Sequence, residues 1–258
     1  YYHFNLEDDA PHLTEIERER LKELYPKNSF YYYSKILGCR GFVEGAAYAS
    51  LMDKYIHLRA FDDIVLDNIQ EIVLSVDVGS NKHIEDTSKA STVATLTGFS
   101  KGYQRVIVLE CWLIPAISHD SIIEECEKKM EWWWVNYMYK FTKVVIDSAE
   151  SILINTWNEK NKFPTLTIKG AIKHTANGMN LVSRCELKQQ LLVQERLLWS
   201  DKAINSFNAH TRILLDEDGK ELDLGVQDND ISDSLTYGLT ENWNYLIKQE
   251  RRKNRWQV

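Results

Sequence analysis

The chain has 258 residues, of which 44% are hydrophobic and 27% charged, a composition typical of one globular domain or of one domain with an attached subdomain. Its 4 prolines and 11 glycines exclude collagen-like and low-complexity architectures. The 31 basic and 38 acidic residues give a net charge of −7, which argues against a general affinity for nucleic acid.

The first part of the chain, residues 1–68, is predicted to be a connector. It begins with a charged, capped helix near residue 14 and continues with an aromatic stretch at 30–33 and small residues at 45–47. From residue 69 the pattern changes to β-rich runs at 71–78, 92–99 and 105–113, separated by glycine-containing turns. Three sequential strands with tight turns predict an antiparallel meander, which opens a second domain at 69–258.

Helices and strands then alternate along the chain. The pattern predicts a helix at 121–139, a buried strand at 143–147 and a helix at 151–161. A short strand at 165–169, a partly helical stretch at 171–190, a hairpin with an Asp-Gly turn at 213–226 and an amphipathic helix at 230–248 follow. This order predicts an α/β fold with a ribonuclease H-like mixed sheet, in which an antiparallel three-strand meander is joined by parallel strands and flanked by helices.

The apolar runs and the cysteines indicate the cellular compartment of the protein. The longest apolar runs, such as 72–74 and 144–146, are far shorter than the roughly 20 residues that cross a bilayer, so we expect no membrane partner. The 4 cysteines are spread out and no pair has metal-knuckle spacing, which favours a reducing cytosol. Residues 1–4 carry neither an initiator methionine nor an apolar signal core, so we expect a protein that is not secreted and a fragment of a longer chain.

Two aspartates stand at the ends of apolar strands, where an unpaired charge needs a compensating partner. Asp77 lies in a β-run and is followed two residues later by a glycine that permits close approach of a ligand. Asp147 ends the most hydrophobic strand of the second half, and open α/β sheets bind ligands outside the carboxyl ends of their strands. Asp77 also fits a turn cap, so each residue alone leaves the interpretation open.

A second pair of acids opens the last predicted helix. Asp230 and Asp233 are three residues apart and share one helix face, although acids at a helix start are also favoured by the helix dipole alone. Together with Asp77 and Asp147 they predict one site for two divalent ions, where one ion activates water and the other stabilises the leaving oxygen of a phosphodiester. Carboxylate oxygens without a thiolate or imidazole cluster suit Mg²⁺ or Mn²⁺.

Short motifs around these acids resemble a known family. The motifs are VDVG at 76–79, VIDSAE at 145–150 and DNDISDSLTY at 228–237, and they are preceded by KILGCRGFVEG at 35–45. In this order and spacing they are similar to the nuclease portion of the large terminase subunit of tailed bacteriophages, in which a stretch like 35–45 joins the motor to the nuclease. The resemblance covers nearly the whole chain.

The resemblance implies an activity and a set of site residues. Asp77, Asp147 and Asp233 would be the catalytic metal ligands, and Asp230 would take the position where some relatives carry a histidine or another acid. The implied activity is a metal-dependent endonuclease that cuts concatemeric double-stranded viral DNA during genome packaging in the cytoplasm of an infected bacterial host. The implied partners, besides double-stranded DNA, are the portal protein and the small terminase subunit, reached through the full-length protein.

Other residues are predicted to touch DNA. Lys169, Lys173 and Lys188 follow a predicted strand, in a region that resembles the DNA-facing segment of the family, so phosphate contacts are predicted for them against the alternative of a solvated surface. A basic tail over 248–258 is a further candidate. The three consecutive tryptophans at 132–134 point about 100° apart on a helix, so they predict packing rather than a platform for stacking bases.

No Gly-x-x-x-x-Gly-Lys-Ser/Thr loop occurs, so the family's ATPase motor is expected upstream, in the missing part of the protein. Two alternatives to the nuclease remain from the sequence. The chain could instead be a non-catalytic docking module that links such a motor to portal or capsid and keeps vestigial acids. The Asp-Val-Gly turn also occurs in actin-like ATPases, a less favoured interpretation because that fold needs a second copy of its lobe.

Overall fold

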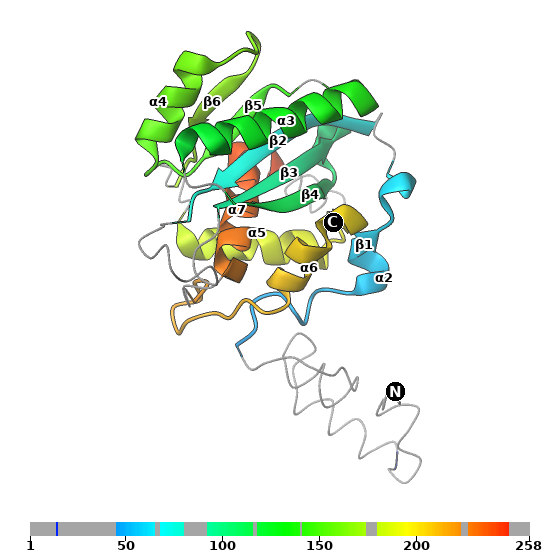
Figure 1. Ribbon diagram of the computed structural model, residues 1–258. Helices are drawn as coiled ribbons and strands as arrows, with labels where there is room; N and C mark the ends of the chain where they lie inside the picture. The colour runs from blue at the N-terminus through cyan, green and yellow to red at the C-terminus, as the bar shows by residue number, and fades with distance from the viewer. Residues whose placement is uncertain are drawn as a thin grey trace.

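The sheet is built from strands that lie far apart in the sequence. In the computed structural model, residues 14, 45–64, 68–79, 92–115, 118–139, 141–173, 180–222 and 227–247 are described. These residues form a seven-stranded sheet in the order β1-β7-β4-β3-β2-β5-β6 (Figure 1). The strands are β1 (Leu58–Arg59), β2 (Ile69–Asp77), β3 (Thr92–Ser100), β4 (Val106–Ile114), β5 (Lys143–Ile146), β6 (Thr167–Gly170) and β7 (Leu197–Ser200).

Strand directions confirm the predicted mixed sheet. β3 runs antiparallel to both of its neighbours, β2 and β4. The pairs β2–β5, β5–β6, β4–β7 and β1–β7 are parallel. The meander therefore forms the centre of the sheet, and parallel strands extend it on both sides. Each meander strand is nine residues long and rich in β-branched and aliphatic side chains, which suit a buried pleated surface.

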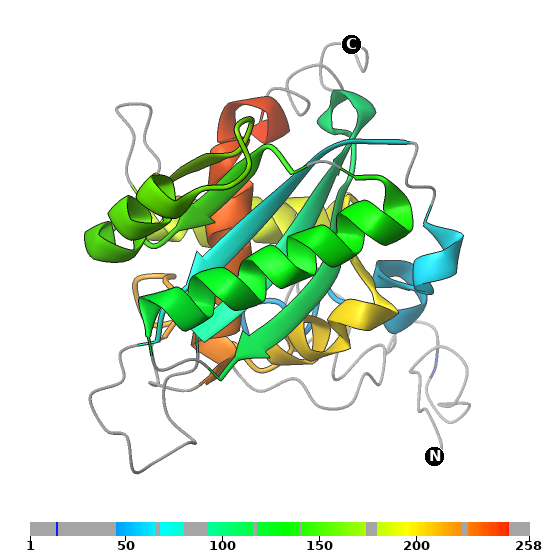
Figure 2. The same ribbon diagram turned by 45° about the horizontal axis from the view of Figure 1, so that its top comes forward.

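Helices cover both faces of the sheet. They are α2 (Lys54–His57), α3 (His119–Tyr137), α4 (Ser151–Lys160), α5 (Leu181–Val193), α6 (Ile204–His210) and α7 (Gln227–Glu241). In Figure 2, α3 crosses one face of the sheet and α7 lies behind it on the other. The Ser118 side chain caps the first turn of α3, as expected of a serine, and the helix ends where Met138 takes a left-handed conformation.

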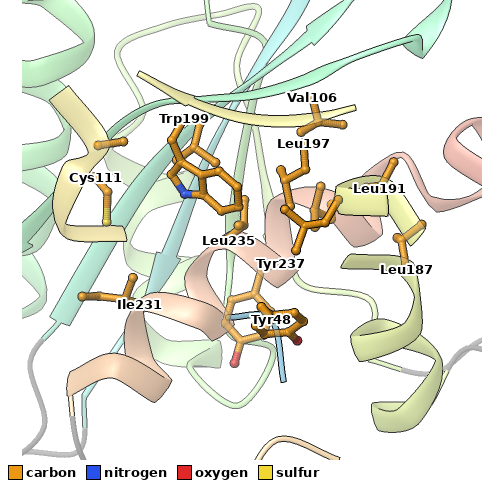
Figure 3. Close-up of a cluster of buried hydrophobic side chains, with 14 of the residues drawn as sticks. Tyr48, Val106, Cys111, Leu187, Leu191, Leu197, Trp199, Ile231, Leu235 and Tyr237 are labelled. Atoms are coloured by element: carbon orange, nitrogen blue, oxygen red, sulfur yellow. The ribbon is translucent and has the colours of Figure 1, made fainter. Parts of the chain in front are cut away.

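Alternation along β2 divides the core into two clusters. Ile72, Leu74 and Val76 belong to the cluster that includes Cys126 and Trp133 of α3. Val73 belongs to the opposite cluster, which is formed by α5, α6, α7 and the inner strands. Figure 3 shows part of that cluster, with side chains such as Trp199, Leu191 and Leu235. Because successive side chains of a strand point to opposite faces, Ser75 and Asp77 lie on the α7 face with Val73.

The three tryptophans of α3 are divided between core and surface, as predicted. Trp133 is fully buried and packs edge-on against Phe61, with ring centroids 5.7 Å apart. Trp132 and Trp134 are about 40% exposed, and the rings of Trp132 and Trp133 are inclined by 74°. No flat platform for successive bases results, which confirms that these residues mainly serve packing.

Several elements were not predicted from the sequence. β7, α6 and the short strand β1 are absent from the predicted order, although β7 pairs with β1 and β4 in the sheet. Within the predicted connector, Ala47 and Tyr48 are buried in the same core cluster as α5 and α7. The domain boundary at residue 68 remains a prediction, and the basic tail at 248–258 lies outside the described residues. None of the described helices is both long and apolar enough to span a membrane.

Candidate metal centre

Asp77 and Asp147 meet at the carboxyl edge of two neighbouring parallel strands. Val76 of β2 is paired with Ile146 of β5, and each aspartate is the next residue in its chain. The backbone N–H of Asp147 donates to the carbonyl of Val76 across 3.2 Å. The alternation of both strands directs these residues to the face that α7 covers. Two parallel strands therefore deliver two carboxylates to one place.

Helix α7 is held close to the sheet by small side chains. A Cβ atom on Gly238 would lie 3.1 Å from Thr97 Oγ1 and 3.2 Å from Ser75 Oγ, so only glycine permits this approach without adjustment. The hydroxyls of Ser234 and Thr95 are 2.6 Å apart and join the helix to β3. This close packing brings the acids of α7 to the edge where β2 and β5 end.

Electrostatics show that the four predicted acids lie near one another. Burial, and then the negative charges of Asp233, Asp230 and Asp147, raise the pKa of Asp77 to about 8. Burial and the charge of Glu221 raise the pKa of Asp233 to about 6. The structure thus gathers Asp77, Asp147, Asp230 and Asp233, the residues singled out from the sequence, although they span more than half of the chain.

Asp147 differs from its neighbours because it has cationic and hydrogen-bonding partners. Burial would raise its pKa, but hydrogen bonds and charge outweigh burial and lower it. Its Oδ1 accepts from the N–H of Ala149 at 2.9 Å and lies 2.5 Å from Lys173 Nζ. Its Oδ2 accepts from the Tyr237 hydroxyl at 3.0 Å. These partners therefore favour the ionised form of Asp147, whereas the pKa values of Asp77 and Asp233 are raised.

The donor chemistry of the site fits a hard divalent cation. All four candidate ligands are carboxylates. Burial and then the neighbouring negative charges raise the pKa of Asp77, and a divalent ion would offset both effects. Among the described residues, no three His, Cys, Asp or Glu side chains already stand as a metal-binding group. The Lys173 ammonium is the cation that contacts Oδ1 of Asp147, so a metal ion at this oxygen would compete with it.

The predicted DNA contacts have different surroundings. Lys173 lies in the acidic site, and Lys169 bonds to Glu241 of α7 at 2.8 Å. Lys188 is only 1% exposed, and its ammonium contacts Glu221, Ser232 Oγ at 2.7 Å and Thr236 Oγ1 at 2.9 Å. These partners already satisfy the ammonium of Lys188, and its contact with a DNA phosphate stays a prediction. Lys188 lies on the buried side of α5. The sequence predicted a partly helical stretch here but did not indicate which of its sides is buried.

Three neighbouring residues were not predicted as part of the site. Tyr237 stands four residues after Asp233 and therefore on the same helix face, a signal that could have identified it. Arg184 is 5% exposed and belongs to α5. Glu221 follows an Asp-Gly turn and pairs with Lys188. Nothing in the local sequence of Arg184 or Glu221 indicates that the fold places them beside the acids.

Known proteins resemble this chain in structure rather than in sequence. No family model and no curated protein matches the sequence. The large terminase of a thermophilic bacteriophage aligns at 18% identity with a TM-score of 0.55, covering 92% of this chain and 53% of that one. The P22 large terminase nuclease domain aligns at 12% identity with a TM-score of 0.53, covering 79% and 95%. The nuclease domain of the bacteriophage SPP1 large terminase, solved with bound Mn, has a TM-score of 0.47 at 13% identity, covering 72% and 95%.

The extent of these alignments shows which part of a large terminase this chain resembles. The chain spans about half of the large terminase of the thermophilic bacteriophage but nearly all of the P22 nuclease domain. This agrees with the resemblance found in the sequence motifs. The chain therefore shares its fold with the nuclease domain of bacteriophage large terminases.

Proposed function

We propose that the chain is the nuclease part of a large terminase subunit, a divalent-metal-dependent endonuclease that cuts concatemeric double-stranded viral DNA during genome packaging. The observation that carries this proposal is the convergence of Asp77, Asp147, Asp230 and Asp233 at one edge of the sheet. Burial of Asp77 and the like charges gathered around it raise its pKa at the expense of its ionised form, an arrangement that is common at functional sites. The fold supports the same activity.

Asp77, Asp147 and Asp233 would hold two Mg²⁺ or Mn²⁺ ions, with Asp230 as a further ligand. Bound there, the ions would supply an activated water and stabilise the leaving oxygen of the phosphodiester. The side chains of the protein prepare the site for this chemistry. With a pKa of about 8, Asp77 is mostly protonated at neutral pH, so it releases a proton when a cation replaces the repulsion of its neighbours.

Tyr237 and Lys173 act on Asp147. The Tyr237 hydroxyl fixes the orientation of the carboxylate through Oδ2. Lys173 neutralises Oδ1 and, once displaced, has its ammonium free beside the acids for a phosphate of the DNA backbone. The side chain of Lys173 is 34% exposed, so it has room to turn from one partner to the other.

The proposed partners follow from the packaging role. Double-stranded DNA is the substrate, and the portal protein and small terminase subunit would be reached through the longer protein in the cytoplasm of an infected bacterium. An ATPase motor would belong to the same longer protein. Base-specific selection would come from these partners, because backbone contacts carry no sequence information directly.

The test is cleavage of supercoiled plasmid by the chain with Mn²⁺, Mg²⁺ or a chelator. Asp77→Asn and Asp147→Asn should abolish cutting and retain the circular-dichroism spectrum of the wild type. Asp120→Asn is the matched control, because Asp120 is 66% exposed on α3, where it pairs with Lys160. Cutting that persists in chelator or in both site variants contradicts the proposal. A folded wild type that binds no Mn²⁺ and never cuts would favour the docking-module alternative.

A further inference from the structure

A cavity of about 230 Å³ adjoins the acidic site and is shared between α5, α7 and the segment around residue 220. Asp230 and Asp233 belong to both the cavity and the proposed metal site. Its other charged lining residues, within the described part of the chain, are Arg184, Lys188, Lys220 and Glu221. The cavity is therefore a polar space that opens directly beside the carboxylates.

Most of these charges already have partners. Lys188 pairs with Glu221, and Lys220 lies 2.8 Å from the exposed carboxylate of Asp218. The buried pair leaves Lys188 little capacity for a further ligand, whereas the pair of Lys220 is exposed and weak. Asp230 and Asp233 line the same cavity, and the proposed metal ions would use their carboxylates as ligands.

Arg184 is the exception among the cations. The residue is 5% exposed, and its Nη2 donates to the backbone carbonyl of Lys173. Its Nε is buried and has no hydrogen-bond partner among the residues that the structure describes. Burial lowers the pKa of Arg184 and the charge of Asp233 offsets part of this effect, which places the two groups near one another. A buried guanidinium with an unused N–H is costly unless a ligand completes it.

The chemistry of that ligand follows from the guanidinium. Its planar set of N–H donors matches the oxygens of a phosphate, which it binds with short, charge-assisted bonds. A phosphate would bring negative charge beside Asp230 and Asp233. Among the described lining residues the cations and acids are equal in number, so a divalent ion on the acids makes the cavity net positive. Metal binding should therefore favour entry of the phosphate.

We propose that this cavity is a phosphate subsite, in which Arg184 binds a backbone phosphate of the DNA strand next to the phosphodiester that is cut. The proposal rests on the proposed nuclease function, because the metal-loaded acids fix where the cut takes place. Arg184 would position the strand without touching the reacting atoms. Its carbonyl contact at Lys173 would link strand binding to the segment that carries the displaced lysine.

DNA affinity tests the subsite without cleavage. Ca²⁺ takes the same oxygen ligands, and anisotropy of a short fluorescent duplex measures binding, with gels confirming that the probe stays intact. Arg184→Gln should weaken binding by about tenfold, the effect of one charge-assisted contact. Arg184→Lys keeps the charge and a donor for the carbonyl of Lys173. Its affinity for the duplex should lie between those of the wild type and Arg184→Gln. Thermal melts of both variants establish that they are folded.

The matched control is Arg59→Gln, which removes the same charge from an exposed position of β1, where the Arg59 guanidinium donates to the carbonyl of Tyr55. It should change affinity by less than about twofold. A folded Arg184→Gln variant that binds the duplex as tightly as the wild type overturns the proposal. So does an equal loss of affinity in Arg59→Gln, because the effect would then be one of general charge.

Binding of inorganic phosphate tests whether the cavity takes a phosphate of a DNA strand or only a free anion. With Mg²⁺ present, broadening of the ³¹P signal should occur with the wild type and not with Arg184→Gln. Loss of this broadening without any loss of duplex affinity overturns the assignment to the DNA strand. Failure of the nuclease function looks different, because the wild type itself would then neither bind Mn²⁺ nor cut plasmid. If only the subsite fails, both properties of the wild type remain.

Discussion

The Tyr237 hydroxyl donates to Oδ2 of Asp147 across 3.0 Å, joining helix α7 to the carboxyl end of strand β5. The contact links two elements that are 90 residues apart in the chain. It also fixes the direction in which one of the candidate metal ligands points. Orientation of a ligand by such a neighbour is a common way in which proteins tune metal sites.

Tyr237→Phe should therefore reduce metal binding and cleavage while the core remains intact. The substitution keeps the buried ring, and loss of one hydrogen bond to a charged group should cost about 2 kcal/mol of stability. Mn²⁺ affinity, measured by calorimetry, should fall by about tenfold, as expected for an oriented ligand. Unchanged Mn²⁺ affinity would show that Asp147 needs no orientation by Tyr237.

Replacing Lys173 with methionine should have opposite effects on metal binding and on stability. Without the ammonium at Oδ1, Mn²⁺ no longer competes with a resident cation, so its affinity should rise by roughly tenfold. In chelator the variant should be less stable by about 1 kcal/mol, because the acids lose their counter-charge. Lys169→Met is the control, since Lys169 pairs with Glu241 instead. Equal Mn²⁺ affinities in wild type and Lys173→Met would refute the competition.

Stability in chelator should fall as the pH rises. The pKa of Asp77 is 3.8 in a model peptide and about 8 in the folded chain, so between these values the folded state holds more protons than the unfolded state. This contribution to stability is fully present below about pH 4 and is lost by about pH 8. Asp233, with a pKa of about 6, adds to the decline over the lower part of this range.

Thermal melts across this pH range measure the effect. Asp77→Asn should flatten the decline, because the amide does not titrate, whereas Asp120→Asn should leave it unchanged. Saturating Mn²⁺ should weaken or reverse the decline in the wild type, since bound metal favours the ionised carboxylates. A wild-type midpoint that rises between pH 5 and 8 in chelator would contradict the pKa of Asp77.

Gly238→Ala should disturb the site from a distance. The new Cβ atom would press on Thr97 Oγ1 and Ser75 Oγ, both of which are buried in the sheet. Overpacking of this kind costs about 1–3 kcal/mol, and relief requires α7 to move away from β2 and β3. We expect a lower midpoint in urea and weaker Mn²⁺ binding together. Lower stability with full Mn²⁺ affinity would show that the acids tolerate a shifted helix.

The sequence was informative where local patterns determine structure. The meander and α3 follow from runs long enough to show their periodicity. Asp77 and Asp147 were identified because a charge at the end of an apolar strand is unusual, and Asp230 and Asp233 because they share one face at the start of a helix. β1 has two residues and β7 has four, too few for a clear pattern. The burial of Lys188 and the position of Arg184 depend on which face of α5 meets the sheet. That information is tertiary and does not exist in the local sequence.

The origin of the four acids in distant segments has a consequence for synthesis of the protein. Asp77 and Asp147 lie at the ends of strands that are made before α7, whereas Asp230 and Asp233 arrive with α7, the last helix that is described. A chain still emerging from the ribosome can form the meander but lacks half of the proposed ligands. The proposed site would thus be assembled only after α7 has been made, and a chain that stops before this helix would lack nuclease activity.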